Sequence, residues 1–390
     1  MIEQKLKKNI ATKNALSEEG VTCSNCILSI NDTKNISFDE RGVCNYCNNY
    51  FALMKNIGSK EKRTKWLNEK VEEIKIAGKN KKYDCVIGIS GGLDSCYLAL
   101  WAKENGLRPL LVHFDNGWNS ELALTNIQSI CYKLEFDLQT IVINWNEFKQ
   151  LQLAYLRAGV IDIEVLTDHA ISSTIEKLAR KNRIKYNISG FNYSTEAIMP
   201  RGWAFDKTDF VNINDINKKF GSVQIKTYPH LIIAKRLWYS FFQKTETVMV
   251  LNYLNRNQQE IKKELTEKLG WREYGGKHYE SVFTKFYQAY ILPKKFGVDK
   301  RKAHLSNLIC SEQITKKQAY QKLNEPLYNM EELKIEKAYV LKKLDLSEND
   351  FDKIMSEKPR KHKEFKTQKK FWKVYFAILK LLRPWKKIAI

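Results

Sequence analysis

Between residues 83 and 189, short apolar runs alternate with longer stretches of helical character. The apolar runs are five to seven residues long and are bounded by turn residues, which predicts β-strands rather than helices. The predicted strands are 83–89, 109–114, 138–143 and 185–189. The predicted helices are 94–105, 121–134 and 168–182. This alternation predicts an α/β fold with a parallel sheet covered by helices on both faces.

The segments on either side of this alternating pattern do not continue it. The first twenty residues are polar, a charged helical stretch precedes the first strand, and the chain beyond residue 231 is mainly helical without a repeat. The predicted regions are an N-terminal segment with a cysteine module (1–50), a helical connector (51–82), the α/β domain (83–230), a helical domain (231–350) and a basic amphipathic tail (351–390).

Four of the eight cysteines form two pairs with the spacing C-x2-C-x17-C-x2-C. Two thiolates of one tight turn can face a single ion, so two such turns complete a tetrahedron around zinc and leave no open position. The predicted structural zinc ligands are Cys23, Cys26, Cys44 and Cys47. Two disulfides or a redox pair are the alternatives, and a reducing cytosol disfavours disulfides. The scattered cysteines, expected to be buried apolar side chains, are Cys85, Cys96, Cys131 and Cys310.

A glycine-containing loop, Ser90-Gly91-Gly92-Leu93-Asp94-Ser95, follows the first predicted strand and opens the next helix. Its glycines allow an anion to approach the backbone closely, and the helix N-terminus presents free N–H groups. Ser90 and Ser95 add hydroxyl donors, while Asp94 can hold magnesium or orient the loop. The loop lacks the spacing and the lysine of a Walker A motif. In a parallel sheet such loops bind ligands at the ends of the strands, which also points to 115–118 and 190–196.

The SGGLDS loop resembles the PP-loop of the ATP pyrophosphatase superfamily, whose members have a Rossmann-like (HUP-like) parallel sheet. The resemblance implies that the loop grips the β- and γ-phosphates of ATP with Mg²⁺, that pyrophosphate leaves, and that the substrate is adenylated. An oxygen that bears AMP is a good leaving group, whereas an amide oxygen is a poor one. The superfamily includes both amide-forming synthetases and tRNA thiolases.

Further segments look like the signature of the N-acetyl sugar amidotransferases of surface-polysaccharide and lipopolysaccharide O-antigen biosynthesis, and the resemblance covers about residues 21–330. These segments are DNGW at 115–118, LTDH at 166–169, SGFNYSTE at 189–196, YGGKHYES at 274–281 and KFGVDKR at 295–301. The resemblance implies an ATP-dependent, AMP-forming C–N ligase. Its substrate would be a nucleotide-linked acetamido sugar, and its product an acetamidino sugar.

The resemblance also implies site residues. The residues expected to bind pyrophosphate are Ser90, Gly91, Gly92, Asp94 and Ser95, and those expected at the nucleoside and the sheet edge are Asp115 and Gly190. The residues expected to neutralise phosphate or to meet substrate or magnesium are Lys277, Lys300, Arg301 and Glu280. A solvated basic face is the alternative for the 277–301 cluster. Asp168 and His169 can either act in the site or simply open the following helix.

Ammonia is scarce at neutral pH, and the chain shows no complete glutaminase of its own. His278 and Glu280 match a His-x-Glu pair, but no cysteine has the context of a nucleophile elbow. We therefore expect a separate class I glutaminase subunit. The resemblance implies one similar to the glutaminase of imidazole glycerol phosphate synthase, with a synthase-like companion.

The net charge of +22 is concentrated toward the end of the chain, where residues 351–390 carry thirteen basic and three acidic side chains. Cations at spacings of three, four and seven along 366–387 predict a basic amphipathic helix. Such a helix can lie on an anionic membrane, or dock on the core or a partner. No 18-residue apolar run and no apolar leader are visible, so we expect a cytoplasmic protein, with the inner membrane face as an option for the tail.

A PP-loop enzyme that modifies tRNA, such as a thiolase, is the alternative function, because it would explain the cysteine pairs and the positive charge together. Thiolases commonly carry sulfur on further cysteines in the catalytic domain, and here those cysteines stand alone. No RNA-binding signature is visible, so nucleic acid is not expected as a partner.

Overall fold

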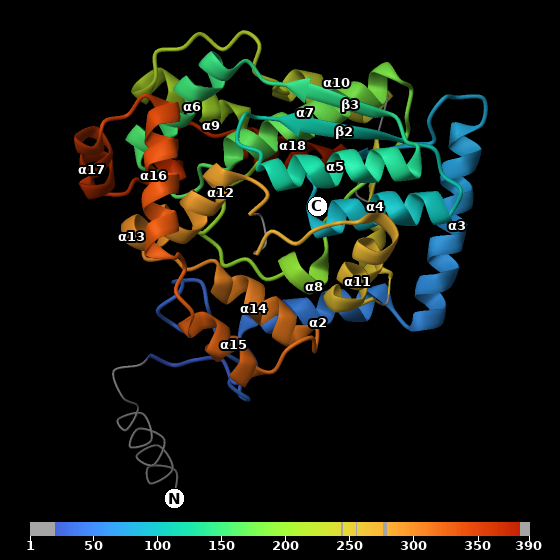
Figure 1. Ribbon diagram of the computed structural model, residues 1–390, viewed down its shortest axis with the longest axis horizontal. Helices are drawn as coiled ribbons and strands as arrows, with labels where there is room; N and C mark the ends of the chain where they lie inside the picture. Colours follow the sequence, from blue (N-terminus) through green and yellow to red (C-terminus); the bar gives the residue numbers. More distant parts are fainter. Residues whose placement is uncertain (1–19, 243–244, 255, 276–278, 383–390) are drawn as a thin grey trace, which may run out of the picture.

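The computed structural model describes residues 20–242, 245–254, 256–275 and 279–382 (Figure 1). The polar N-terminal lead-in before residue 20 and the end of the basic tail after residue 382 lie outside these ranges. No helix in the described part of the chain has the length and apolarity needed to cross a membrane.

A five-stranded parallel sheet forms the centre of the fold, in the order β3-β2-β1-β4-β5. The strands are β1 (Cys85–Gly88), β2 (Pro109–Asp115), β3 (Leu138–Val142), β4 (Tyr186–Ile188) and β5 (Glu246–Val248). The four predicted strands and the parallel α/β fold are thus confirmed. The sequence pattern did not predict β5, a three-residue edge strand in a region expected to be helical. It pairs with β4 through Tyr186 and Glu246, so the sheet extends past residue 230.

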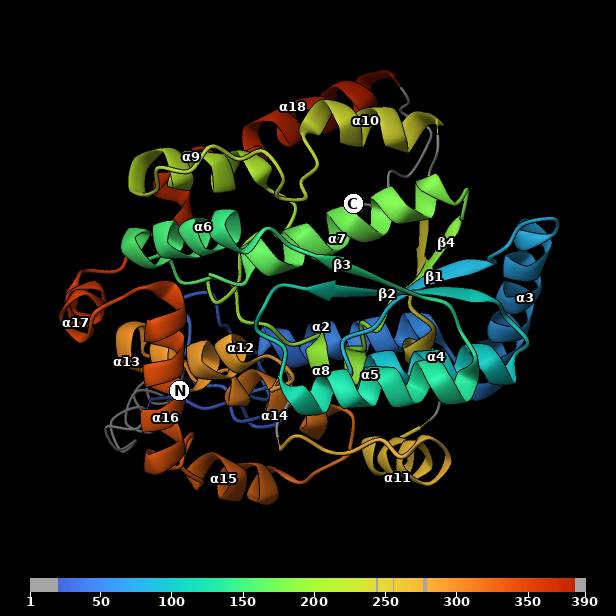
Figure 2. The same cartoon turned by 45° about the horizontal axis from the view of Figure 1, so that its top comes forward.

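Helices cover both faces of the sheet (Figure 2). One face carries α7 (Val165–Lys181), and the other carries α4 (Leu93–Glu104), α5 (Glu121–Leu134) and α11 (Gln258–Leu269). Side chains of a strand alternate between the faces. In β1, Val86 packs with Leu178 of α7, whereas Ile87 packs in the other core with Leu98 of α4. Both cores are apolar because both faces of the sheet are buried.

The largest apolar cluster lies beyond the sheet and joins the middle of the chain to its C-terminal third. Besides the start of α7, the helices that contribute to it are α6 (Trp145–Ala158), α9 (Phe210–Phe220), α12 (Val282–Phe286), α13 (Leu292–Phe296), α16 (Met330–Leu344) and α17 (Glu348–Ser356). The remaining elements are α2 (Asn45–Ile57), α3 (Lys60–Gly78), α8 (Tyr193–Glu196), α10 (Ile233–Phe242), α14 (Arg301–Cys310), α15 (Lys316–Asn324), α18 (Lys369–Leu382), the 3-10 turns 250–252 and 362–364, and a π-helical turn at 287–291.

Two predicted helix boundaries are wrong. The connector 51–82 is two helices, α2 and α3, because Gly58 adopts φ +88 and ends the first one. The predicted helix 168–182 begins three residues earlier, with Glu164 as the residue that precedes its first turn. Asp168 and His169 therefore lie inside α7 and do not open it.

The order of the strands creates a switch point at β1. From β1 the chain proceeds to β2 and β3 on one side, and then crosses to β4 and β5 on the other side. The crevice at the carboxyl ends of β1 and β4 is the position at which open α/β sheets bind ligands. At the opposite end, buried Asp84 accepts hydrogen bonds from the Arg108 backbone N–H at 2.8 Å and the Arg108 guanidinium at 2.6 Å, which ties the starts of β1 and β2 together.

Candidate functional site

The SGGLDS loop lies at the carboxyl end of β1, and α4 begins inside it at Leu93. Gly91 adopts φ +80, a conformation that favours glycine. A Cβ atom at this position would stand 2.4 Å from the backbone oxygen of Ala123 in α5. The loop therefore passes so close to α5 that only glycine fits.

Two buried side chains from distant segments fix this loop by binding the carbonyl oxygen of Gly91. The indole N–H of Trp271 donates to it at 3.0 Å, and the amide of Asn126 donates at 3.3 Å. Asn126 also pairs with the backbone of Arg272, through its amide at 2.9 Å and its oxygen at 3.0 Å. Trp271 and Asn126 are missed by the sequence analysis, because neither belongs to the loop motif and only the fold brings them to it.

The two loop serines hold each other in place. The Ser95 hydroxyl oxygen accepts from the Ser90 backbone N–H at 3.2 Å and lies 3.3 Å from the Ser90 hydroxyl, which itself accepts from the Gly92 N–H at 3.2 Å. A glycine cradle, two hydroxyls and the first turn of a twelve-residue helix fit the triphosphate of ATP. The hydroxyls and the N–H groups would exchange these internal bonds for phosphate oxygens.

Tyr274 and Glu280 close the loop on its open side. The Tyr274 hydroxyl accepts from the Leu93 backbone N–H at 3.2 Å. Glu280 Oε1 lies 3.5 Å from the point where a Cβ atom on Gly92 would stand. Burial, followed by the nearby charge of Glu280, raises the pKa of Tyr274, so its hydroxyl stays protonated. Backbone pairing holds Glu280 here, since its carbonyl accepts from the Ser120 N–H at 2.8 Å.

The predicted residues Gly190, Asp94 and Asp115 lie along the same edge of the sheet. A Cβ atom on Gly190 would lie 3.8 Å from Asp94 Cβ, which brings the loops after β1 and β4 together. Asp115, at the end of β2, accepts from the Gly117 N–H at 2.8 Å and from the Asn119 amide at 3.0 Å. These bonds shape the turn after β2, and a nucleoside contact for Asp115 stays a prediction.

The predicted basic residues have separate surroundings. The Arg301 guanidinium pairs with Asp299 at 2.8 Å and donates to the Glu325 carbonyl at 2.7 Å, so it stabilises the end of α15. Lys300 Nζ lies 5.7 Å from the centre of the Tyr287 ring. Lys277 and its neighbour His278 lie outside the described residues. Phosphate binding by these cations stays a prediction.

A second group of charged side chains surrounds the start of α7, and of its members the sequence analysis considered only Asp168. Lys207 Nζ lies 2.8 Å from Asp162 and 3.1 Å from Asp168. Glu164 accepts a hydrogen bond from the Thr284 hydroxyl at 2.8 Å. Burial, followed by repulsion from Asp168, raises the pKa of Glu164 to about 7. The only signal in the sequence is three acids within seven residues where a helix opens.

His169 has a structural role. Its Nε2 accepts from the Leu231 backbone N–H at 3.3 Å, so Nδ1 carries the proton and donates to the Lys207 carbonyl at 2.9 Å. The ring is fully buried, and burial lowers its pKa to about 4. His169 is therefore neutral at physiological pH and fixes the backbone that presents Lys207.

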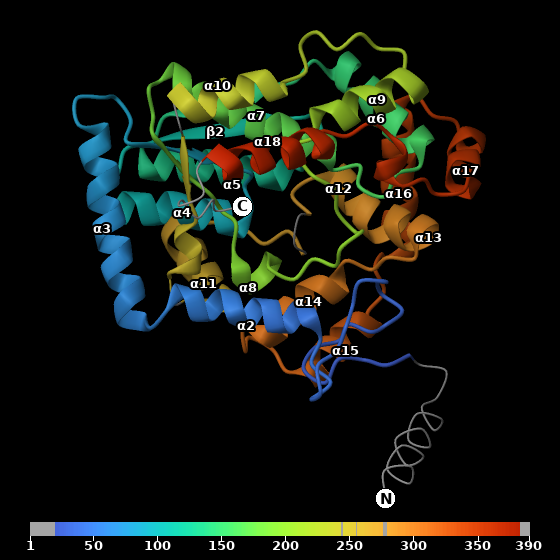
Figure 3. The same ribbon diagram turned by 180° about the vertical axis from the view of Figure 1, so that it is seen from behind.

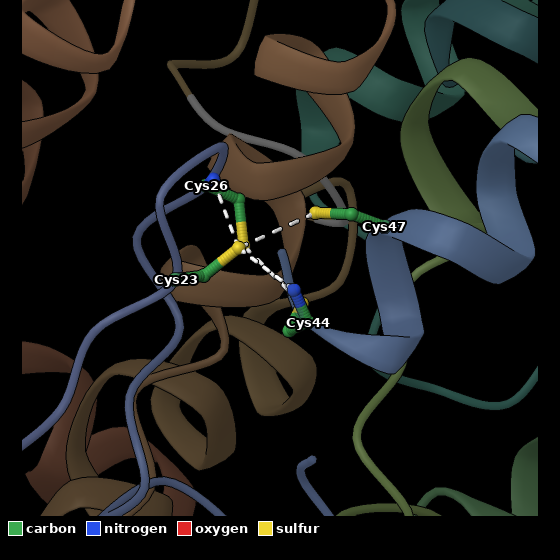
Figure 4. A group of neighbouring side chains, drawn as sticks. All are labelled: Cys23, Cys26, Cys44 and Cys47. Atoms are coloured by element: carbon green, nitrogen blue, oxygen red, sulfur yellow. Dashed lines mark hydrogen bonds between the residues drawn. The ribbon is translucent and has the colours of Figure 1, made fainter. Parts of the chain in front are cut away.

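The four paired cysteines converge on one point (Figure 4). All four are fully buried, and their sulfur atoms lie within 4.8 Å of one another, with 3.9 Å between Cys23 and Cys47 and 3.8 Å between Cys26 and Cys44. Tetrahedral bonds of about 2.3 Å to zinc require sulfur separations of about 3.8 Å. The group can therefore hold a metal ion of that size.

Cys310 is a fifth thiol at this centre, which corrects the expectation that it is a scattered apolar side chain. Its sulfur donates to Cys47 Sγ at 3.4 Å, and the Asn25 amide donates to the sulfurs of Cys47 at 3.5 Å and Cys310 at 3.3 Å. Hydrogen bonds to a metal-bound thiolate stabilise its charge. Cys310 ends α14, so it joins the cysteine module to the C-terminal third of the chain.

The cysteine module also holds the segment that follows Gly190. The Tyr46 hydroxyl accepts from the Arg201 backbone N–H at 3.0 Å, and the Trp203 indole donates to the Asp32 carbonyl at 3.0 Å. Figure 3 shows α2 lying against α14. The module therefore stabilises the loop after β4 through hydrogen bonds to Arg201 and Trp203.

A parallel sheet with an SGGLDS loop after its central strand defines a PP-loop ATP pyrophosphatase. Comparison with family models agrees: residues 84–188 match the queuosine biosynthesis protein QueC, and residues 280–379 match the C-terminal domain of WbpG-like lipopolysaccharide biosynthesis proteins. Each match covers about a quarter of the chain. The α/β region is similar to a PP-loop protein, and the C-terminal region is similar to WbpG-like lipopolysaccharide biosynthesis proteins. The loop and the two matches support an ATP-dependent enzyme.

No curated protein sequence matches the chain. Distant structural similarity extends to an NMN synthetase from Francisella tularensis, with 15% identity over 59% of this chain and 92% of that chain and a TM-score of 0.29. An NH3-dependent NAD synthetase from Campylobacter jejuni has 15% identity over 69% and 98% and a TM-score of 0.30. The U34-tRNA thiolase NcsA from Methanococcus maripaludis, which carries a [4Fe-4S] cluster, has 12% identity over 78% and 89% and a TM-score of 0.31.

Removal of a cysteine ligand tests the metal site. We expect the purified protein to hold about one zinc ion per chain, and Cys44→Ser to lose it and melt several degrees lower, because three thiolates leave the tetrahedron incomplete. Elemental analysis and thermal unfolding measure both effects. Cys131→Ser, at a half-buried position outside the cluster, is the matched control. Full zinc content in Cys44→Ser would contradict the assignment.

Substitution of a loop glycine tests the ATP site. We expect Gly91→Ala to weaken ATP binding at least about tenfold, because its Cβ would push the loop away from α5 and misplace the N–H groups. Gly106→Ala is the matched control, since Gly106 has φ +65 but no atom within 4 Å of a Cβ. It should lose about 1–2 kcal/mol of stability and still bind ATP. Calorimetric titration with Mg-ATP and circular dichroism separate binding from folding.

Proposed function

We propose that the protein is an ATP-dependent amidotransferase of surface-polysaccharide biosynthesis, which converts the acetamido group of a nucleotide-linked sugar to an acetamidino group. The observation that carries the proposal is the union, in one chain, of an intact SGGLDS loop with a C-terminal region of the WbpG-like family. The loop supports adenylation, and the family match supports a role in lipopolysaccharide biosynthesis. The acetamido sugar is implied by the resemblance of the sequence to sugar amidotransferases.

In the first step the acetamido oxygen bonds to the α-phosphorus of ATP, and the bond from that phosphorus to pyrophosphate breaks. The backbone N–H groups of residues 90–93 and the start of α4 hold the departing pyrophosphate, together with the hydroxyls of Ser90 and Ser95. Magnesium, when bound, neutralises phosphate charge. Asp94 in the loop and Glu280 beside it are the carboxylates that would hold it.

In the second step ammonia bonds to the adenylated carbon, the carbon–oxygen bond to AMP breaks, and AMP leaves with the electron pair. Ammonia would come from a separate class I glutaminase similar to that of imidazole glycerol phosphate synthase, with a synthase-like companion. The chain itself offers no cysteine in the context of a nucleophile elbow. We place the protein in the cytoplasm, where nucleotide-linked sugars and glutamine are available, and zinc in its cysteine module.

The alternative, a thiolase-like tRNA-modifying enzyme, needs a thiol near the SGGLDS loop to carry sulfur. Cys85 and Cys96 are the cysteines of β1 and α4, and both are fully buried. Burial raises the pKa of both thiols, and it raises the pKa of Cys131 to about 11. Thiols in this state are poor nucleophiles at neutral pH, which favours ammonia over sulfur as the attacking group.

Incubation of the full chain with Mg-ATP, ammonium chloride and a panel of nucleotide-linked N-acetyl sugars tests the proposal. We expect AMP and pyrophosphate to form with one sugar, whose mass falls by the difference between O and NH. Mass spectrometry reads all three products, and the Gly91→Ala variant is the negative control. Formation of AMP with tRNA alone would overturn the sugar assignment and support the thiolase-like alternative.

A further inference from the structure

The start of α7 faces the same crevice as the SGGLDS loop, from the other face of the sheet. Helix α7 packs on β1, β2 and β4 and leads into β4, so its first turn lies at the carboxyl ends of the strands. The Asn116 amide after β2 donates to the Thr167 hydroxyl of α7 at 3.4 Å. Helix α4, which the loop opens, covers one face of the sheet, and α7, which Glu164 precedes, covers the other (Figure 2).

One short segment touches both sides of the crevice. Glu280 lies beside Gly92 of the loop, and four residues later Thr284 binds Glu164. Ser281, between them, opens α12 by accepting from the Thr284 N–H at 3.3 Å. Five consecutive residues, 280–284, therefore link the SGGLDS loop to Glu164.

We propose that Glu164 is the catalytic base that accepts the proton of the attacking ammonia. The inference rests on the proposed amidotransferase function and assigns its second step. The ammonia nitrogen bonds to the adenylated carbon, one of its N–H protons passes to the Glu164 carboxylate, and the carbon–oxygen bond to AMP breaks. The carboxyl group then returns the proton to the amidine or to water, so charge and atoms balance.

Glu164 differs from its acidic neighbours in what it binds. Asp162 and Asp168 share the ammonium group of Lys207, and although burial opposes ionisation of Asp162, Lys207 and Lys300 lower its pKa. Glu164 instead receives a neutral hydroxyl from Thr284. A carboxylate held by a neutral donor in a buried site keeps the basicity that a charged partner would remove.

The groups around Glu164 come from four segments and act in both directions. They are Asp162 and Asp168 beside it, Thr284 and Tyr287 from α12 and the turn after it, Lys207, and Lys300. Burial and Asp168 raise the pKa of Glu164 to about 7, against Thr284, Lys207 and Lys300, which lower it. The carboxylate form therefore predominates above neutral pH and is lost as the pH falls below about 7.

The variant Glu164→Gln separates the two steps. We expect it to keep sugar-dependent exchange of pyrophosphate into ATP within about threefold, and to lose at least about 100-fold in product formation from ammonia. In the wild type, the product rate at constant free ammonia should fall as the pH drops below about 7, and the glutamine variant should lack this dependence. Glu69→Gln, on the exposed face of α3, is the control.

Thr284→Val tests the same carboxylate without removing it. The lost hydroxyl stabilised the ionised form, so we expect the acid limb of the product rate to move to higher pH while pyrophosphate exchange persists. A purely structural Glu164 would not move this limb. Product formation by Glu164→Gln near the wild-type rate, or equal loss of exchange and product, would overturn the inference alone. Wild-type protein without exchange on any sugar would overturn the proposed function itself.

A separate observation concerns α10 and α18, which lie next to each other on the outer side of α7 and α9 (Figures 2 and 3). Both helices are amphipathic, and neither residues 231–245 nor residues 365–390 contain an acid. Their large exposed apolar side chains are Ile232 (47%), Trp238 (51%), Phe371 (40%) and Val374 (59%). The exposed cations that the structure describes on these helices are Lys235, Lys369, Lys370 and Lys373.

We infer that this two-helix face docks on an anionic lipid surface. Exposed apolar side chains on two helices that carry exposed cations and no acid of their own match the interface of a bilayer with negatively charged headgroups. The predicted tail helix is thus joined by α10, which the sequence analysis did not single out. Each cation near such a surface contributes about 1 kcal/mol, so the face suits reversible binding.

Sedimentation of the full chain with vesicles tests the inference. We expect binding to phosphatidylglycerol–phosphatidylethanolamine vesicles, a loss of at least about tenfold in Lys370→Glu/Lys373→Glu and in Trp238→Ser, and weakening by salt. Ile76→Ser, at an exposed apolar position on α3, should bind like the wild type. Equal binding to neutral phosphatidylcholine vesicles, or no binding, would overturn the inference. The inference would also be overturned if light scattering showed a dimer that Trp238→Ser converts to a monomer without a loss of vesicle binding.

Discussion

The fold depends on one close contact, the passage of the loop after β1 against the first turns of α5. Gly91 reaches this position because it has no side chain, and its carbonyl then receives Trp271 and Asn126. Those donors come from segments 35 and 180 residues away. An unpaired buried carbonyl is costly, so the loop, α5 and the 271–274 segment are stable only together. The same bonds fix the loop whose Gly92 and Leu93 N–H groups bind the hydroxyls of Ser90 and Tyr274.

The chemistry and the scaffold are drawn from different parts of the chain. The α/β domain supplies the phosphate loop, whereas residues 279–284 complete the crevice between Gly92 and Glu164. The cysteine module lies behind, against α14, where Cys310 and Asn25 bond its sulfurs. A metal there would order the 197–203 segment, and through it the loop after β4. The module therefore influences the site by holding the 197–203 segment in place.

What the sequence could predict is local. Four strands, α4, α5 and the SGGLDS loop follow from short-range patterns, and the four cysteines follow from their spacing. Strand β5 has only three residues and is defined by its pairing with β4, so the hydrophobic pattern of the sequence does not predict it. Cys310 meets Cys47 across 263 residues, and Glu164 meets Thr284 across 120 residues. Such pairs depend on the complete fold. For Arg301, the resemblance implies a phosphate contact, and the structure shows its guanidinium bound to Asp299 and to the Glu325 carbonyl.

Several buried charged side chains lie together near the start of α7, although burial of a charge costs free energy. Asp162 is fully buried, and its ionisation is tolerable because Lys207 lies 2.8 Å away. The two charges of this pair neutralise each other, so Asp162 is a poor proton acceptor for a substrate. Glu164 lies beside the pair but outside it, and burial, followed by repulsion from Asp168, raises its pKa to about 7. A carboxyl group with a pKa near physiological pH contributes little to the stability of a fold, but it can both accept and release a proton. Glu164 has such a pKa and precedes the helix that begins at the carboxyl ends of the strands.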